Sequence, residues 1–117
     1  MVNYMCILKN MKPKKNKYNS KKTVVDGWTF DSRLEADYYR HLKSTQELYH
    51  IKNIFRQVPL LLAQKSKLVV DFMIHYENGD LLFADTKGFM TANASTKIKI
   101  AERLYNIKIH IVKRGDF

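Results

Sequence analysis

Residues 68–88, LVVDFMIHYENGDLLFADTKG, are the stretch that decides the fold. Two apolar runs, Leu68–Ile74 and Leu81–Ala84, are separated by turn residues, a pattern that is typical of a β-hairpin. The first run contains Asp71, and Asp85 follows the second. A carboxylate inside an apolar strand is costly unless it is paired, hydrogen-bonded or bound to a metal ion. The hairpin therefore predicts a partner for the two acids.

The length of the hairpin loop decides whether the two acids share a face of the sheet. A two-residue loop, Asn78-Gly79, sets Asp71 opposite Thr86 and places the acids on opposite faces. A three-residue loop, Glu77-Asn78-Gly79 with a left-handed glycine, sets Asp71 opposite Asp85 on one face. The sequence permits either loop. We expect the longer one because it gives both buried charges a common ligand.

Lys87 stands two residues after Asp85 and therefore falls on the same face of the strand. An acid, a spacer and then acid-x-Lys on the next strand resembles the signature of the PD-(D/E)XK nucleases. Asp71 fills the first position, although Val70 stands where the pattern has a weakly kept proline, and Asp85-Thr86-Lys87 fills the second. The pattern by itself is weak evidence for a nuclease because Asp and Lys are common. The rest of the chain decides whether the nuclease interpretation is supported.

The composition of the chain indicates which kind of molecule it binds. The 117 residues support one domain with one core, and 21 basic against 11 acidic residues give a net charge of +10. Such an excess predicts nucleic acid as partner before an anionic membrane, and no apolar run approaches the ~18–20 residues of a membrane span. Cys6 is the only cysteine, which excludes an intrachain disulfide. Met1–Leu8 is too short for a secretory signal, so we expect a reducing cytoplasm.

Residues 1–22 are expected to form a flexible basic arm that precedes a single domain at 23–117. Residues 9–22 contain seven lysines and almost nothing to bury. The arm is either a solvated tail or an extension that contacts DNA phosphates without reading bases. The lysines assigned to DNA on the second interpretation are Lys14, Lys15, Lys17, Lys21 and Lys22.

The first helix is expected to carry a third acid. Thr23–Phe30 reads as a short hairpin with an Asp-Gly turn, and Asp31 or Ser32 then caps a helix that runs to about residues 46–48. Glu35 completes a capping box with Ser32, in which it satisfies the Ser32 amide. It is equally placed to point at the Asp71 and Asp85 site, and the two roles are compatible.

The strand predicted at Ile51–Leu62 carries a polar residue beside a break. The break is expected at Pro59, and Gln57 precedes it. The Gln57 amide either satisfies an edge backbone group or contacts metal-bound water.

The predicted second helix follows the acidic hairpin directly. It begins near residues 93–95 and ends at Asn106, with a strand expected at Ile107–Val112. Its broad apolar face is expected to contain Ile98, Ile100, Ala101, Leu104 and Tyr105. Its basic residues, which are either solvated or in contact with phosphates, are Lys97, Lys99 and Arg103.

The predicted order of helix, three strands, helix and strand matches the αβββαβ core of the PD-(D/E)XK fold. The chain is also similar to a family of small phage-encoded nuclease-like proteins of this fold, from about Lys14 to Val112. The residues that carry this similarity are Lys21-Lys22-Thr23, Val25-Asp26-Gly27, Phe30-Asp31-Ser32, Glu35-Ala36, Tyr39, Gln57, Asp71-Phe72, Asp85-Thr86-Lys87-Gly88, Lys97 and Lys99. Val58 between Gln57 and Pro59 departs from the family pattern. The resemblance implies an α/β domain with a central mixed sheet flanked by helices.

The resemblance implies a metal-dependent DNA endonuclease. Mg²⁺, or Mn²⁺ in its place, would be held by Asp71, Asp85, the Thr86 carbonyl and Glu35, and Lys87 would orient the attacking water. The catalytic set is then Glu35, Asp71, Asp85 and Lys87.

We expect the substrate to be branched or recombining phage DNA, such as a Holliday junction. We also expect a homodimer in the host cytoplasm, with no membrane and no small-molecule substrate, since cutting two strands needs two sites. The alternatives are a catalytically silent DNA-binding or assembly protein on the same fold, or a basic scaffold whose acids are only salt-bridged to lysines.

Overall fold

Two helices and six strands make up the part of the chain that the computed structural model describes, residues 22–117. In chain order they are β1 Thr23–Val25, β2 Trp28–Phe30, α2 Arg33–Ser44, β3 Ile51–Ala63, β4 Ser66–Tyr76, β5 Leu81–Thr86, α3 Ala92–Tyr105 and β6 Ile109–Val112. This confirms the expected order of helix, three strands, helix and strand after a short hairpin. Asp26 and Gly27 both have positive φ, as the Asp-Gly turn of that hairpin requires.

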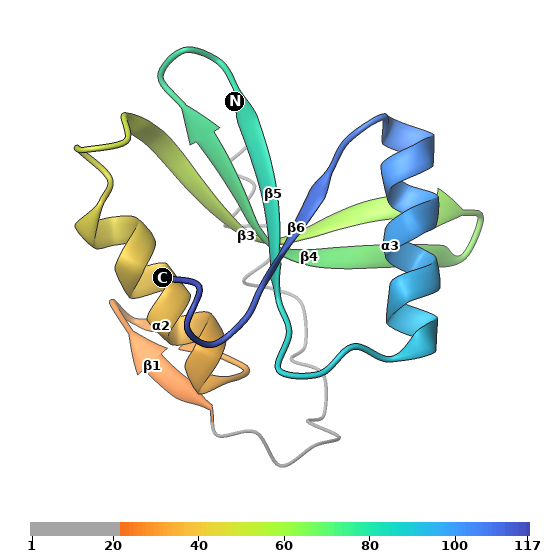
Figure 1. Cartoon of the computed structure of the whole chain (residues 1–117), viewed down its shortest axis with the longest axis horizontal. Coiled ribbons are helices and arrows are strands. Elements are labelled where there is room, and N and C mark those ends of the chain that lie inside the picture. The colour runs from red at the N-terminus through yellow and green to blue at the C-terminus, as the bar shows by residue number, and fades with distance from the viewer. Residues whose placement is uncertain (1–21) are drawn as a thin grey trace.

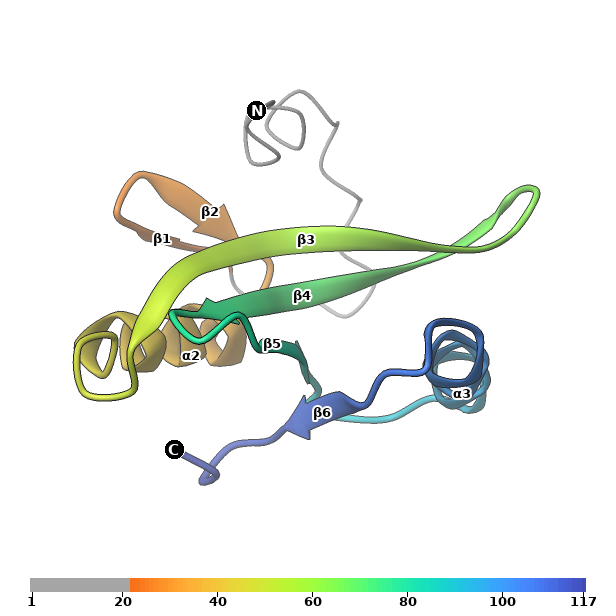
Figure 2. The same cartoon turned by 90° about the horizontal axis from the view of Figure 1, so that it is seen from above.

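The strands form a two-stranded sheet, β1-β2, and a four-stranded sheet in the order β3-β4-β5-β6. β5 and β6 are parallel and the other neighbours are antiparallel, so the larger sheet is mixed, as expected. Figures 1 and 2 show α2 and α3 at opposite ends of the long β3–β4 ribbon, with the small hairpin beside α2. The fold is therefore a mixed α/β domain with two helices around a central sheet.

The β4–β5 hairpin has the three-residue loop. Phe72 pairs with Ala84, and the Tyr76 N–H donates to the Asp80 carbonyl at 2.9 Å, so the register sets Asp71 opposite Asp85. Gly79 has φ +94°, the left-handed conformation that this loop demands. The expected loop is confirmed, and both acids lie on one face.

Alternate residues of β4 hold two hydrophobic clusters together. Phe72 and Ile74 belong to a cluster under α2, which also contains Phe30, Tyr38, Tyr39 and Leu42. Leu68 and Val70 belong to a second cluster with Ile98 and Ala101 of α3. Asp71 lies between Val70 and Phe72 in the sequence, and so at the boundary between the two clusters.

Helix α2 begins as expected and ends earlier. The Ser32 side chain accepts a hydrogen bond from the Glu35 N–H at 3.0 Å, which caps the first turn. The helix stops at Ser44 rather than at residues 46–48, because Thr45 leaves the helical conformation, with φ −104° and ψ 7°. Its hydroxyl then donates to the His41 carbonyl at 2.8 Å. Turns then carry the chain to β3.

The break predicted at Pro59 is absent. β3 continues to Ala63, and Pro59 pairs with Val69. Proline fits here because β3 is the edge strand of the sheet. The irregularity lies two residues earlier, at Gln57, whose φ is +52°.

Helix α3 buries a narrower face than predicted. Thr91 caps it and Asn106, with φ +53°, ends it, as expected. Only Ile98 and Ala101 are buried, while Ile100, Leu104 and Tyr105 are exposed, so the prediction of a broad buried face was wrong. The two buried residues of α3 pack in a cluster with Leu68, Val70 and Ile109 of the sheet, and this cluster does not extend to Ile100, Leu104 or Tyr105. The final strand begins at Ile109, two residues later than predicted.

Most of the predicted basic arm lies outside the described residues. Of its lysines assigned to DNA, Lys14, Lys15, Lys17 and Lys21 fall there, and Lys22 is exposed. Between residues 22 and 117 the structure has no helix long and apolar enough to cross a membrane.

Candidate functional site

Asp71 and Asp85 meet across the β4–β5 pair. The backbone N–H of Asp71 donates to Oδ1 of Asp85 at 3.1 Å, and Asp85 is 1% exposed. The Lys87 ammonium lies 2.9 Å from Oδ2 of Asp85. The structure therefore brings together the three charged residues of the hairpin that the sequence singled out.

Thr86 supports Asp71 with its side chain and its amide. Its N–H and its hydroxyl both donate to Oδ2 of Asp71, at 2.9 and 2.7 Å. Sequence reasoning considered only the carbonyl of Thr86 as a metal ligand. These two donors hold the Asp71 carboxylate in one orientation.

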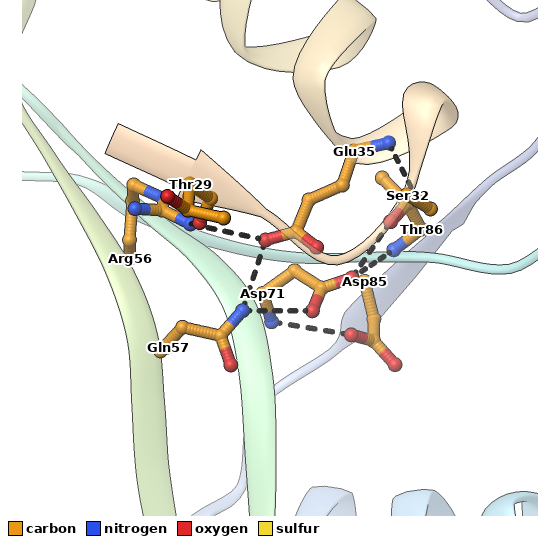
Figure 3. Close-up of polar contacts among 8 residues, drawn as sticks. All are labelled: Thr29, Ser32, Glu35, Arg56, Gln57, Asp71, Asp85 and Thr86. Carbon is orange, nitrogen blue, oxygen red and sulfur yellow. Dashed lines mark hydrogen bonds and ion pairs between the residues drawn. The ribbon is translucent and has the colours of Figure 1, made fainter. Parts of the chain in front are cut away.

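Glu35 reaches the same place from α2. Its side chain is buried, and Oε1 accepts a hydrogen bond from Gln57 Nε2 at 2.9 Å. The same Gln57 nitrogen lies 3.3 Å from Oδ1 of Asp71. Figure 3 shows the carboxylates of Glu35, Asp71 and Asp85 in a row, with the Gln57 amide beside the first two. The Ser32 hydroxyl caps the Glu35 N–H, but the Glu35 carboxylate bonds Gln57 and Arg56 and not the Ser32 amide, so of its two expected roles the structure shows only the approach to the acids.

The backbone of Gln57 is strained. Its φ of +52° lies in the left-handed region, which costs a residue with a Cβ atom ~1–2 kcal/mol. No pairing joins Gln57 to Asp71, although the residues on either side, Arg56 and Val58, pair with Phe72 and Val70. Such strain is concentrated at functional sites, and here it accompanies an amide that joins two carboxylates.

Arg56 is a site residue that sequence reasoning missed. It is buried, its Nη2 donates to the Thr29 carbonyl at 3.0 Å, and the same atom lies 3.5 Å from Oε1 of Glu35. Its guanidinium also stacks on the Phe30 ring, 3.8 Å from the ring centre. An available signal was an arginine inside the apolar run at 51–62, which needs a partner for the same reason as Asp71.

Burial raises the pKa values of two of the acids. Burial, and then the charges of Asp85 and Glu35, raise the pKa of Asp71 well above 3.8. Burial also raises the pKa of Glu35 from 4.5 to about 6, although Arg56 and the Gln57 hydrogen bond oppose it. The site therefore holds more negative charge than its own cations compensate.

Lys87 keeps its proton. Burial alone would lower its pKa, but the nearby carboxylates of Asp85, Asp71 and Glu35 outweigh burial and raise the pKa above 10.5. Lys87 is thus an ammonium at neutral pH and cannot act as a general base there.

The chemistry of the donor set fits a divalent cation. Glu35, Asp71 and Asp85 supply hard oxygen atoms of the kind that Mg²⁺ prefers, and Oδ2 of Asp85 has no partner besides Lys87 in the described part of the chain. A cation would also offset the repulsion that raises the pKa of Asp71. Across residues 22–117, however, no three acidic, histidine or cysteine side chains form a ready ligand set. The Gln57 amide lies against Glu35 and Asp71, and the Lys87 ammonium lies against Asp85.

The basic residues of α3 do not join this cluster through any contact. Lys99 and Arg103 are exposed, and at 100° per residue they lie roughly opposite the buried Ile98 and Ala101. Lys97 lies on the flank of the helix and is half-buried. Only two of the three residues therefore share the outward face.

Comparison with known proteins places the chain in a family without assigning it an activity. Residues 15–116 match a family described as "Protein of unknown function (DUF1064)". No curated protein matches the sequence.

Proposed function

Because the chain belongs to this family of unknown function, DUF1064, we propose its function from the site: a Mg²⁺-dependent DNA endonuclease with a PD-(D/E)XK core. The substrate would be phage DNA during recombination or replication, including branched forms such as Holliday junctions, and the active form a homodimer in the host cytoplasm. The compartment and the phage origin rest on the resemblance of the sequence alone.

One observation carries the proposal. Asp71, Asp85 and Lys87 converge on one face of a β-hairpin, and Glu35 is joined to Asp71 through Gln57. Helix α2 and the hairpin β4–β5, which are distant in the sequence, thus deliver three carboxylates and one ammonium to one place. Perturbed carboxyl pKa values at such a cluster are more typical of a reactive site than of surface salt bridges.

Phosphodiester hydrolysis needs an activated water, compensation for charge on the phosphate oxygens and a stabilised leaving group. Bound Mg²⁺ would supply Lewis acidity and lower the pKa of a coordinated water. Asp71, Asp85, Glu35 and the Thr86 carbonyl are the residues that would hold it. The chain's own contributions are the donors of Thr86, which orient Asp71, and the Lys87 ammonium, which neutralises charge on the phosphate.

A second candidate is a DNA-binding protein on the same fold that does not cut. The observation that favours it is that Gln57 and Lys87 already pair with the acids, in the way that a purely structural cluster would. Both candidates predict binding to DNA, so cleavage separates them.

The deciding experiment is cleavage of a plasmid and of a four-way junction with Mg²⁺, by the natural chain and by Asp85→Asn. We expect the substitution to lower the rate by ~10³-fold, in line with other losses of electrostatic stabilisation. DNA binding should be retained, because the change removes negative charge.

Asp80→Asn is the matched control, since it removes the charge of an exposed aspartate in the same hairpin. It should cut at the rate of the natural chain. Cleavage that survives Asp85→Asn would indicate a contaminating nuclease, and binding without any cleavage by the natural chain would support the second candidate.

A further inference from the structure

Phe89 is the most exposed of the large apolar side chains in the described part of the chain. It is 72% exposed, and its neighbour Met90 is 36% exposed. Neither residue belongs to either of the two hydrophobic clusters. A single apolar side chain in water is ordinary, but Phe89 and Met90 are adjacent and form an exposed apolar pair directly after the candidate site, which is the position of a ligand contact.

The ring is held close to the candidate site. Only Gly88 separates it from Lys87, so the Cα atoms of Phe89 and Lys87 are at most ~7 Å apart, about the length of two stacked bases. On one side the Lys87 N–H donates to the Val112 carbonyl at 3.0 Å. On the other side Thr91 caps α3 by accepting from the Ala94 N–H at 3.0 Å. The connection between β5 and α3, which Figure 1 shows, is therefore anchored at both ends.

The surroundings favour nucleic acid as the occupant. The basic side chain of Lys87 lies two residues before Phe89, α3 has no acidic residue in its first turn, and the chain carries a net charge of +10. An aromatic ring beside cations is the usual platform for an unpaired base. Two side chains are also far too small a surface for a stable protein interface, which buries ~1,200–2,000 Å².

We propose that Phe89, with Met90, stacks on an unpaired or unstacked base next to a backbone phosphate that contacts the Lys87 ammonium. The protein would then prefer DNA at a junction between single and double strands over uninterrupted duplex. Inserting an apolar side chain between paired bases must disrupt stacking, and this cost is smallest where the base is already unpaired. The inference rests on the proposed function, and it names the form of DNA that the same site takes.

The test measures binding in EDTA, where metal-dependent cleavage cannot occur. The probes are a fluorescent splayed-arm DNA and a duplex of the same length and sequence. We expect the natural chain to bind the splayed-arm DNA more tightly. Phe89→Ala should weaken that binding by about tenfold and change duplex binding by less than about twofold. Phe89→Trp should keep the preference, because it keeps a flat ring.

Leu48→Ala is the matched control, since Leu48 is 70% exposed in the turn after α2. It should leave both affinities unchanged. Equal binding of the two DNAs by the natural chain would overturn the proposal, as would an equal loss on both in Phe89→Ala. If sedimentation shows that Phe89→Ala changes the oligomeric state, the ring is a contact between copies and the proposal is wrong. If the natural chain prefers the splayed-arm DNA but never cuts DNA with Mg²⁺, the proposed nuclease function is wrong and the proposed stacking by Phe89 still holds.

Discussion

The polar side chains of Glu35, Arg56 and Gln57 contact one another beside the acids. Gln57 adopts a left-handed backbone conformation, and its amide joins Glu35 to Asp71. Arg56, the preceding residue, holds Glu35 from the other side and stacks on Phe30. Arg56 and Gln57, which are adjacent in β3, thus both bind the carboxylate of Glu35. Because a lone buried charge is costly, each of these residues depends on the other two.

Glu35 gives the site a pH-dependent stability. Its pKa is about 6 in the folded protein against 4.5 in the unfolded chain, so the folded state binds the proton more tightly. The resulting stabilisation is complete below pH 4.5 and is lost as pH rises through about 6, by about 2 kcal/mol. Asp71, whose pKa is also raised, acts in the same direction. We expect urea unfolding to show a free energy that falls between pH 4.5 and 7.

Glu35→Gln should remove its share of this pH dependence, since glutamine does not titrate and its side-chain oxygen can still accept from Gln57. The same urea titrations on the variant check this. An unchanged slope between pH 4.5 and 7 would show that another group is responsible.

At the scale of elements, the β4–β5 loop decides whether the site exists. A loop one residue shorter would move Asp71 and Asp85 to opposite faces, because side chains alternate along a strand. Gly79, with φ +94°, allows the three-residue loop.

Two glycines allow a matched test of that loop. A Cβ atom on Gly79 or on Gly88 meets no atom within 4 Å, and only Gly79 has a positive φ. We therefore expect Gly79→Ala to lower the free energy of unfolding by ~1–2 kcal/mol. Gly88→Ala should lower the free energy of unfolding by less than Gly79→Ala does, or should raise it by up to ~1 kcal/mol. Equal destabilisation in urea would mean that steric contacts, not backbone conformation, set the cost.

At the scale of the whole molecule, Asp71 lies where the two hydrophobic clusters meet. The ribbon β3–β4 extends from α2 toward α3, as Figure 2 shows, and Asp71 is the site residue on β4. The other contacts of the site come from α2, β3 and β5. The arrangement of the acids therefore depends on the packing of α2 against the sheet.

The net charge of +10 makes DNA binding sensitive to salt. Each phosphate contact on duplex DNA contributes ~0.9 to the slope of log K against log salt concentration. If Lys14, Lys15 and Lys17 contact phosphates, changing all three to glutamine should reduce this slope by up to about 2.7. Filter binding or fluorescence anisotropy at several salt concentrations measures it.

Lys43→Gln with Lys52→Gln is the control, because both lysines are exposed and Lys43 lies at the end of α2 away from Glu35. It should leave the slope nearly unchanged. An equal reduction per lysine in both variants would show that binding depends on total charge and not on the N-terminal residues.

Much of this molecule was determined by its sequence alone. The order of elements, the Asp-Gly turn, the Ser32 cap and the end of α3 at Asn106 follow from periodicity and turn chemistry. The sequence favoured a common face for Asp71, Asp85 and Lys87 but permitted either loop, and the register of the folded hairpin decided it. These features are predictable because each depends on residues close together in the chain. Only the tertiary structure decided the unbroken path of β3 through Pro59, the strained Gln57, the ion pair of Arg56 with Glu35 and the narrow buried face of α3. Each of these depends on which surfaces pack together, and a residue's partner 21 positions away leaves no periodic signal in the sequence.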